Sequence, residues 1–263
     1  MMKKCLALVI FLLAIPSPVL AGMDDLLKQL PAAGQMLNNQ GGGGGGGGGS
    51  LSSLGQQDMV SGLKEALGVG IKNAIQLLGR QNGFLGDPQV RIPLPPALQP
   101  MDKLMSIGPA KTYRDQFIGT LNQAAEKAVP VTADIFANSI RQMTIQDAAG
   151  ILRGPDNAAT QYFRKTSSNQ LITAIRPIVT KTTQEAGVTS SYKTLTGSLP
   201  QSKLSLLSNV TKQDVTDLDG YVTGKAVDGL FYKLADEEKQ IRTNPAARSS
   251  DLLQKVFGAA ARR

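Results

Sequence analysis

Residues 142–171, QMTIQDAAGILRGPDNAATQYFRKTSSNQL, contain several helix start and stop signals, and the rest of the predicted fold is organised around them. Thr144 is followed three residues later by Asp147, which is the spacing of a capping box at a helix N-terminus. The Gly-Pro pair at 154–155 predicts the end of that helix, since glycine tolerates a left-handed turn and proline cannot continue a helix. The stretch therefore begins with one short helix.

Two further helix starts are expected within the same stretch. Asp156 is placed to cap a second short helix, and the hydroxyl groups of residues 166–168 offer caps for a third. Polar side chains also stand between the apolar positions: Arg153, Asp156, Asn157, Arg164 and Lys165. The stretch is thus predicted to be both a hub of short helices and a candidate binding surface.

On both sides of this hub, apolar residues recur at steps of three and four, the pattern of one helix face. The predicted helices cover residues 60–78, 98–105, 113–128, 135–143, 171–182 and 218–241. Their expected ends are Gly79, Gly108, Pro130, Gly187 and Asn244. Pro177 is expected to kink the helix in which it lies, and the helix over 218–241 is expected to be the longest.

Residues 82–96, NGFLGDPQVRIPLPP, follow a different pattern, since prolines restrict them to an extended path. Val90, Ile92 and Leu94 alternate with other residues, so that Arg91 is expected to point away from the three apolar side chains. We expect an ordered loop across the helix surface. Arg91 either marks a binding rim or ties the loop to the helices through a buried ion pair.

The predicted fold class is therefore all-α, an irregular multi-helix bundle with a proline-rich ordered loop. Residues 1–21 are assigned to a signal peptide and residues 22–50 to a short helix and a linker of nine consecutive glycines. Residues 51–258 are assigned to a single helical domain and residues 259–263 to a basic tail. Within the domain, the serine- and threonine-rich residues 190–219 predict no definite path.

The first residues have the three parts of a secretory signal peptide. Two lysines precede an apolar run at 6–15, and small residues lead to Ala21. We expect export to the periplasm or the exterior, with cleavage between Ala21 and Gly22. The apolar run is about half as long as a membrane span requires, and Cys5 lies before it and leaves with the signal peptide.

The composition of the expected mature chain excludes several kinds of site. Its 242 residues contain no cysteine and no histidine, which rules out disulfides, cysteine nucleophiles, Ser-His-Asp triads and histidine-ligated metals. Carboxylate chemistry, Ser-Lys chemistry and an oxygen-ligated cation remain open. No metal and no cofactor are expected.

The charge of the expected mature chain indicates the kind of partner. With 26 basic and 20 acidic residues it carries a net charge of +6, which favours anionic lipid headgroups or acidic glycans. The chain has no tryptophan and no stripe of alternating aromatic and basic residues, so nucleic acid is not an expected partner. No transmembrane segment is expected after cleavage.

Three stretches carry a resemblance to a known family: VRIPLP at 90–95, QMTIQDAAGILRGPDNAATQYFR at 142–164, and GYVTGKAVDGLFYKLADEEKQIRTNPAARSSDLLQKVFG at 220–258. Together they resemble the bacterial domain-of-unknown-function family 4197, over roughly residues 53–258, with a poor match at 195–216. The resemblance implies an exported, mostly helical single domain. It implies no activity.

The first candidate site consists of Arg153, Asp156, Tyr162 and Arg164. Two guanidinium groups near a helix N-terminus can hold a carboxylate or a phosphate, because the helix end adds partial positive charge. The alternative is that Asp156 caps its own helix and that the arginines pair with nearby carboxylates.

The second candidate is the acidic run Asp236, Glu237 and Glu238. Two carboxylates can do acid–base work on a glycan, but neighbours on a helix point about 100° apart and cannot converge on one bond. A solvated helix face is therefore expected here.

These observations favour an exported helical protein without catalysis, a binding or accessory protein of the cell envelope. Its expected partner is an anionic ligand or an envelope component. The ligand-binding candidates are Arg153, Asp156, Tyr162, Arg164 and Arg91. One alternative is a carboxylate-dependent hydrolase of envelope polymers, which needs two carboxylates facing each other across a cleft. Another is a peripheral binder of anionic membrane, which needs an exposed apolar patch beside basic residues.

Overall fold

The computed structural model describes residues 55–96, 98–187, 217–244, 246 and 254. Every regular element in these ranges is a helix and none is a strand, so the predicted all-α class is confirmed. The expected signal peptide, glycine linker and basic tail lie outside the described residues, as do most of residues 190–219. The division into domains stays a prediction.

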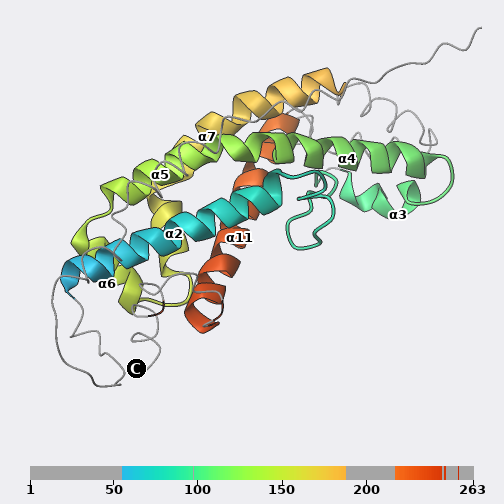
Figure 1. Ribbon diagram of the computed structural model, residues 1–263. Helices are drawn as coiled ribbons and strands as arrows, with labels where there is room; N and C mark the ends of the chain where they lie inside the picture. The colour runs from blue at the N-terminus through green and yellow to red at the C-terminus, as the bar shows by residue number, and fades with distance from the viewer. Residues whose placement is uncertain (1–54, 97, 188–216, 245, 247–253, 255–263) are drawn as a thin grey trace, which may run out of the picture.

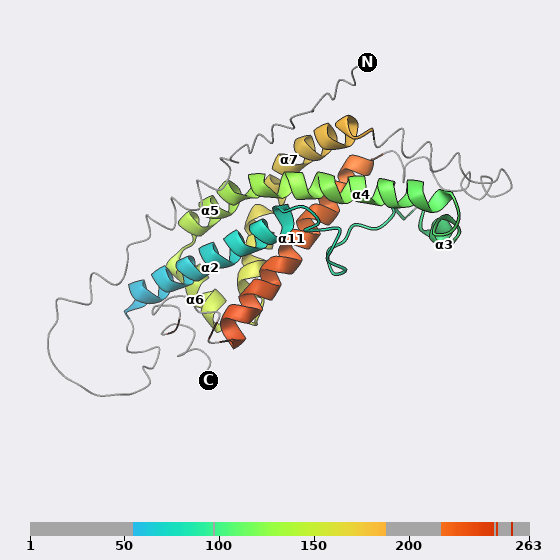
Figure 2. The same cartoon turned by 45° about the vertical axis from the view of Figure 1, so that its right-hand side comes forward.

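Helix α11 (Leu218–Thr243) lies at the centre of the packing. It runs obliquely across the other long helices in both views (Figures 1 and 2), and it contacts α7 (Ala158–Glu185), α2 (Gln56–Gly79) and α4 (Ala110–Ala128). Helix α4 continues through the 3₁₀ turn η5 (Val129–Thr132) into α5 (Ala133–Gln142). The short helix α6 (Ile145–Arg153) then leads to α7.

The smaller elements η4 (Gln99–Met101) and α3 (Asp102–Met105) precede α4 at the opposite end of the molecule from α6. Between α2 and η4 runs the proline-rich loop, which contains no strand over the described residues 80–96. Val90, Ile92 and Leu94 are buried and Arg91 is exposed. The predicted ordered loop and the predicted direction of Arg91 are both confirmed.

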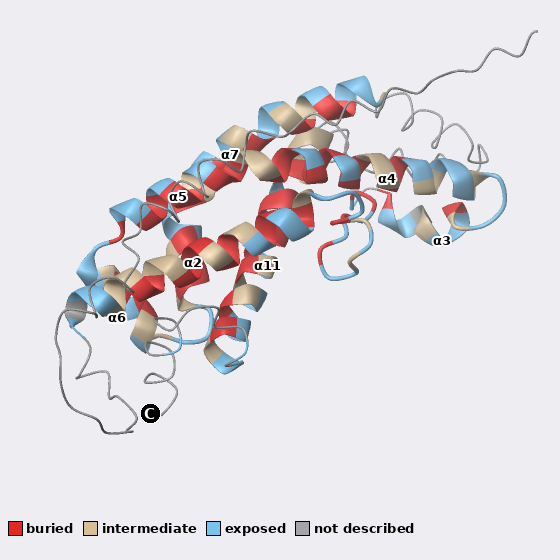
Figure 3. Ribbon diagram, viewed as in Figure 1, coloured by how far each residue is buried: buried red, intermediate tan, exposed pale blue. Residues whose placement is uncertain are grey.

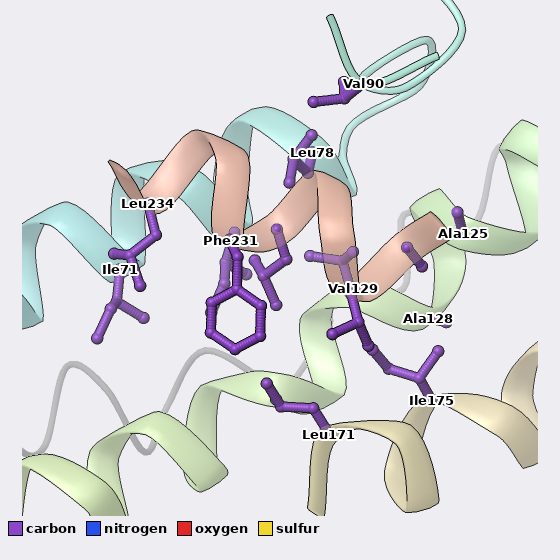
Figure 4. Packing of buried hydrophobic residues seen from close by; sticks show 14 of the residues in the cluster. Ile71, Leu78, Val90, Ala125, Ala128, Val129, Leu171, Ile175, Phe231 and Leu234 are labelled. Carbon is purple, nitrogen blue, oxygen red and sulfur yellow. The ribbon is translucent and has the colours of Figure 1, made fainter. Parts of the chain in front are cut away.

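The hydrophobic core forms where the helix faces meet (Figure 3). Phe136 of α5 contacts the ring of Phe163 of α7 edge-on at a centroid distance of 5.4 Å, and that of Phe231 of α11 at 6.3 Å. Ile71 of α2 and Leu171 of α7 point toward the same interior as Phe231 (Figure 4). The apolar periodicity of the sequence therefore identifies the helix faces that pack against α11 in the core.

Helix α7 is one continuous helix of 28 residues, so the third helix start predicted at residues 166–168 is wrong. The hydroxyls there do not cap a helix: Thr166 donates to the carbonyl of Tyr162 at 2.9 Å, and the buried Ser167 shares a hydrogen bond with Ser139 of α5 at 2.7 Å. Hydroxyls have this alternative of bonding within or between helices. Helix α7, not α11, is consequently the longest described helix, and it continues past Pro177.

Most predicted helix ends are confirmed, and one has a different cause. Gly108 and Gly187 adopt left-handed φ angles of 63° and 62° after α3 and α7. Gly154 follows α6 as predicted, but its φ is −78°, so it makes no left-handed turn. A Cβ atom at Gly154 would lie 2.6 Å from that of Ala158, which shows that close approach requires the glycine here.

The capping box predicted at the start of α6 is confirmed. The backbone N–H of Asp147 donates to the Thr144 hydroxyl at 3.1 Å, and the backbone N–H of Thr144 donates to the Asp147 carboxylate at 3.0 Å. The Thr144 side-chain hydrogen bond, followed by the backbone one, lowers the pKa of Asp147 below its ordinary value. Both partners lie within four residues, so the sequence alone was sufficient to predict this cap.

Replacing Thr144 by alanine should reduce the free energy of unfolding by about 1 kcal/mol at neutral pH. The pKa of Asp147 should rise toward its ordinary value, which an NMR titration would measure. Because a lowered carboxyl pKa stabilises above that pKa and not below it, the deficit of the variant should shrink in acid. Thr166→Ala is the control, since its hydroxyl bonds only within its own helix. Equal losses in the two variants would contradict the cap.

Candidate functional site

The N-terminus of α7 is closed by a carboxylate from α11. Glu238, which is 6% exposed, accepts hydrogen bonds of 2.9 Å from the backbone N–H groups of Ala159 and Thr160 and from the Thr160 hydroxyl. Arg242 donates to the same carboxylate at 2.9 Å and to the carbonyl of Ile151 at 2.8 Å. We call this group the α7 clasp. It joins the end of α6, the start of α7 and the end of α11.

The α7 clasp corrects two predictions. Asp156 is exposed and caps nothing among the described residues, and the N–H groups of Ala159 and Thr160 at the start of α7 donate to Glu238 instead. Glu238 does not lie on a solvated helix face, since it is buried against those donors. The free N–H groups and partial positive charge of a helix start attract a carboxylate, and here the carboxylate is internal.

The other two members of the acidic run point elsewhere. Asp236 is exposed, and Glu237 accepts a 3.0 Å hydrogen bond from Asn73 of α2. Their divergence from Glu238 follows from the helical spacing. Two facing carboxylates of the kind that a glycoside hydrolase requires do not occur in this run.

A second internal carboxylate holds the start of the proline-rich loop. Glu126 of α4, also 6% exposed, accepts backbone hydrogen bonds from Asn82 at 3.2 Å, Phe84 at 3.1 Å and Leu85 at 3.3 Å. Asn82 adopts a positive φ of 60°, which turns these N–H groups toward one point. We call this group the loop clasp.

The rest of the loop is fixed by side chains from two helices. The buried amide of Asn122 accepts from the N–H of Ile92 at 2.8 Å and donates to its carbonyl at 2.9 Å. The hydroxyl of Tyr221 donates to the carbonyl of Pro93 at 3.1 Å, and burial raises the pKa of Tyr221 to about 12. Arg91 takes no part in this anchoring and makes no ion pair with a described residue, so the buried-pair alternative for it is wrong.

Tyr162 and Arg164 contact different neighbouring helices. The Tyr162 hydroxyl donates to the carbonyl of Ser139 of α5 at 3.3 Å, and burial raises the pKa of that tyrosine. The Arg164 guanidinium lies 4.5 Å from the centre of the Phe231 ring, and its Nη1 is 3.5 Å from Oδ1 of the exposed Asp228. Arg164 therefore covers a core aromatic residue of α11.

Arg153 and Asp156 are exposed between α6 and α7, and Arg91 lies on the proline-rich loop. No hydrogen bond or ion pair joins these three to each other, or to Tyr162 or Arg164, within the part of the chain that the structure describes. The surface near the start of α7 thus keeps Arg153 and Asp156 available, while Arg91 is on another element.

A polar cleft that the sequence did not predict lies between the end of α2 and the proline-rich loop. It has a volume of about 560 Å³, and its lining includes Leu77, Arg80, Gln81, Asn82, Asp87 and Lys233. Lys233 pairs with Asp87 at 2.5 Å, and that hydrogen bond lowers the pKa of the Asp87 carboxyl. Arg80 is exposed and its side chain has no hydrogen-bond partner among the described residues. The sequence signal that could have pointed to this cleft is Arg80, which directly follows the predicted helix end at Gly79.

The described residues contain no group of acidic side chains placed to hold a metal ion. Of the helices that the structure describes, none is both long enough and apolar enough to cross a bilayer.

Comparison with known protein families gives a match over most of the chain. The family described as "Protein of unknown function (DUF4197)" matches residues 53–258, a range that includes both clasps and the cleft. No curated protein and no solved structure matches the chain.

Proposed function

We propose a non-catalytic binding or accessory function in the cell envelope for this chain, which belongs to the DUF4197 family of proteins of unknown function. The observation that carries the proposal is the unpaired guanidinium of Arg80 beside Lys233 in the polar cleft. The proposed ligand is a small anion, and the binding site is the cleft.

The charges of the cleft favour an anion. Lys233 neutralises Asp87, so that Arg80 is the cleft-lining charge without a counter-ion among the described residues. A guanidinium binds carboxylate or phosphate through two parallel hydrogen bonds, which gives it both affinity and direction. The side-chain amides of Gln81 and Asn82 line the same cleft and can bond to hydroxyl groups. An acidic sugar has both a carboxylate for Arg80 and hydroxyl groups for the two amides.

Binding is better supported than hydrolysis because of how the nearby carboxylates are used. Asp87 is the one carboxylate among the residues lining the cleft, and it is engaged by Lys233 and by the N–H of Gln89 at 2.9 Å. Glu126 lies beneath the loop and holds backbone donors. Hydrolysis of a glycan by paired carboxylates needs a second free carboxyl group across the cleft.

The envelope part of the proposal depends on the signal-peptide pattern of residues 1–21. The intact mass of the protein isolated from its own host should correspond to a chain that begins at Gly22. A mass that retains Met1 would contradict export by this signal.

Glucuronate is the probe for the cleft, and glucose is the neutral control of similar shape. Calorimetric titration of the mature protein should detect glucuronate and not glucose. Arg80→Gln should weaken glucuronate binding about tenfold or more, since a charge-assisted hydrogen-bond pair is lost. Arg91→Gln, which removes another exposed arginine of the same loop, should leave it unchanged.

Two results would overturn the cleft as the site. Equal binding by the parent and Arg80→Gln would show that Arg80 does not hold the anion. Loss of binding in Arg164→Gln or Arg153→Gln, with Arg80→Gln unaffected, would instead place the ligand on the surface that the sequence predicted near α7. Thermal unfolding of each variant checks that the fold is intact.

A further inference from the structure

The turn between α3 and α4 exposes an unusual share of the large apolar side chains. Ile107 is 66% exposed, and Leu104 and Tyr113 nearby are 37% and 39% exposed. Figures 1 and 2 show α3 and the start of α4 extending beyond the other described helices at one end of the molecule. We call residues 103–113 the α3–α4 tip. Its apolar side chains project from an end of the protein.

The α3–α4 tip has a defined shape. Met105 is buried and anchors α3, and Gly108 makes the turn with a left-handed φ of 63°. Arg114 donates to Asp102 at 2.5 Å and to Asp115 at 2.8 Å, and the Asp102 hydrogen bond raises the pKa of Arg114. This ion-pair bridge ties the two helices together beneath the turn. The position of Ile107 is therefore fixed by the ion pairs of Arg114 and by the buried side chain of Met105.

The charge around these apolar side chains is positive toward solvent. The ammonium of Lys103 is exposed and has no partner among the described residues. Lys111 is also exposed and pairs with Asp115. The two aspartates that border the tip, Asp102 and Asp115, are both engaged by Arg114. The unpaired charge beside Ile107 is thus a cation.

We propose that the α3–α4 tip docks shallowly on an anionic lipid surface. Ile107 and Leu104 would enter the boundary between headgroups and acyl chains, and Lys103 and Lys111 would contact lipid phosphates. Tyr113 has the apolar ring and polar hydroxyl that suit this boundary. A second copy of the chain is a poorer occupant, because three partly exposed side chains offer far less area than a stable dimer buries. The proposal is independent of the polar cleft.

Co-sedimentation of the mature protein with lipid vesicles tests this proposal. Vesicles that contain phosphatidylglycerol should bind the protein, vesicles of phosphatidylcholine alone should bind it weakly, and added salt should reduce binding to the first. Ile107→Asp should lower the partition coefficient about tenfold or more, because it removes an apolar side chain that would be buried and adds a charge that anionic lipid repels. Lys103→Glu should weaken binding to the anionic vesicles alone.

Ile145→Asp is the matched control, since Ile145 is 52% exposed on α6, at the other end of the molecule. It should bind vesicles as the parent does. The proposal is overturned by equal binding of the Ile107 and Ile145 variants, or by no binding of the parent to anionic vesicles. It is also overturned if light scattering shows a dimer that Ile107→Asp dissociates, since the tip would then bind a second copy. Thermal unfolding confirms that each variant is folded.

Discussion

Replacing Glu238 by alanine will lower the free energy of unfolding by about 3–5 kcal/mol, the range found when one partner of a buried ion pair is removed. The change leaves the largely buried Arg242 without this carboxylate and leaves the N–H groups of Ala159 and Thr160 without an acceptor. Urea unfolding measures the loss. Glu237→Ala is the matched control one residue earlier, and it should cost within about 0.5 kcal/mol, because its hydrogen bond to Asn73 is exposed.

The Glu238→Ala variant also leaves a vacant space lined by the groups that had bonded to the carboxylate, namely the Arg242 guanidinium and the N–H groups at the start of α7. A guanidinium and a free helix start bind small anions, so formate should restore part of the lost stability in Glu238→Ala. The parent and the Glu237 variant should show no such gain. If alanine prevents folding, Glu238→Gln keeps the shape of the side chain and one acceptor and should lose less. Equal stability of the Glu237 and Glu238 variants would mean that the α7 clasp does not form.

Replacing Glu126 by alanine will cost about 1–3 kcal/mol, the penalty for a buried donor left unpaired, because the buried N–H group of Phe84 loses its acceptor. The N–H groups of Asn82 and Leu85 lose the same acceptor, but they are only partly buried and add less. The damage should be local to the loop. Hydrogen exchange of the Phe84 amide should accelerate in this variant, while that of the Ala159 amide should change little.

The two clasp variants control each other, since Glu238→Ala should accelerate exchange at Ala159 and spare Phe84. Lys127→Ala is an additional control, because Lys127 is the exposed neighbour of Glu126 on α4. Uniform acceleration at both amides in both variants would show that each glutamate supports the whole fold and not the segment that it contacts.

The features that the sequence predicted depend on neighbours in the chain. The apolar faces of the helices follow a period of 3.6 residues, and the capping box joins Thr144 to Asp147 within one turn. The direction of Arg91 followed from alternation in an extended segment. In each case the physical cause lies within a few residues, so the pattern alone was informative.

The features that the sequence did not predict depend on partners far apart in the chain. Glu238 looked like part of a solvated acidic run, and only the fold brings it to Ala159, 79 residues earlier. The cleft likewise joins Arg80 to Lys233. Residues 166–168 do not start a helix, because a hydroxyl can either cap a helix or donate to a carbonyl within one, and the sequence pattern does not distinguish the two.

The central position of α11 has a consequence for when the protein can fold. Hydrogen bonds from this helix reach back 164 residues to Asn73 and 143 residues to Gln89, in addition to the contacts at α7. Helical proteins ordinarily fold fast because their contacts are local, and long-range contacts slow the process. Here α2 and α7 gain their main packing partner only after nearly the whole chain is available. If the chain is exported from its N-terminus, as we propose, α2 and α7 would therefore lack their main packing partner until α11 has also crossed the membrane.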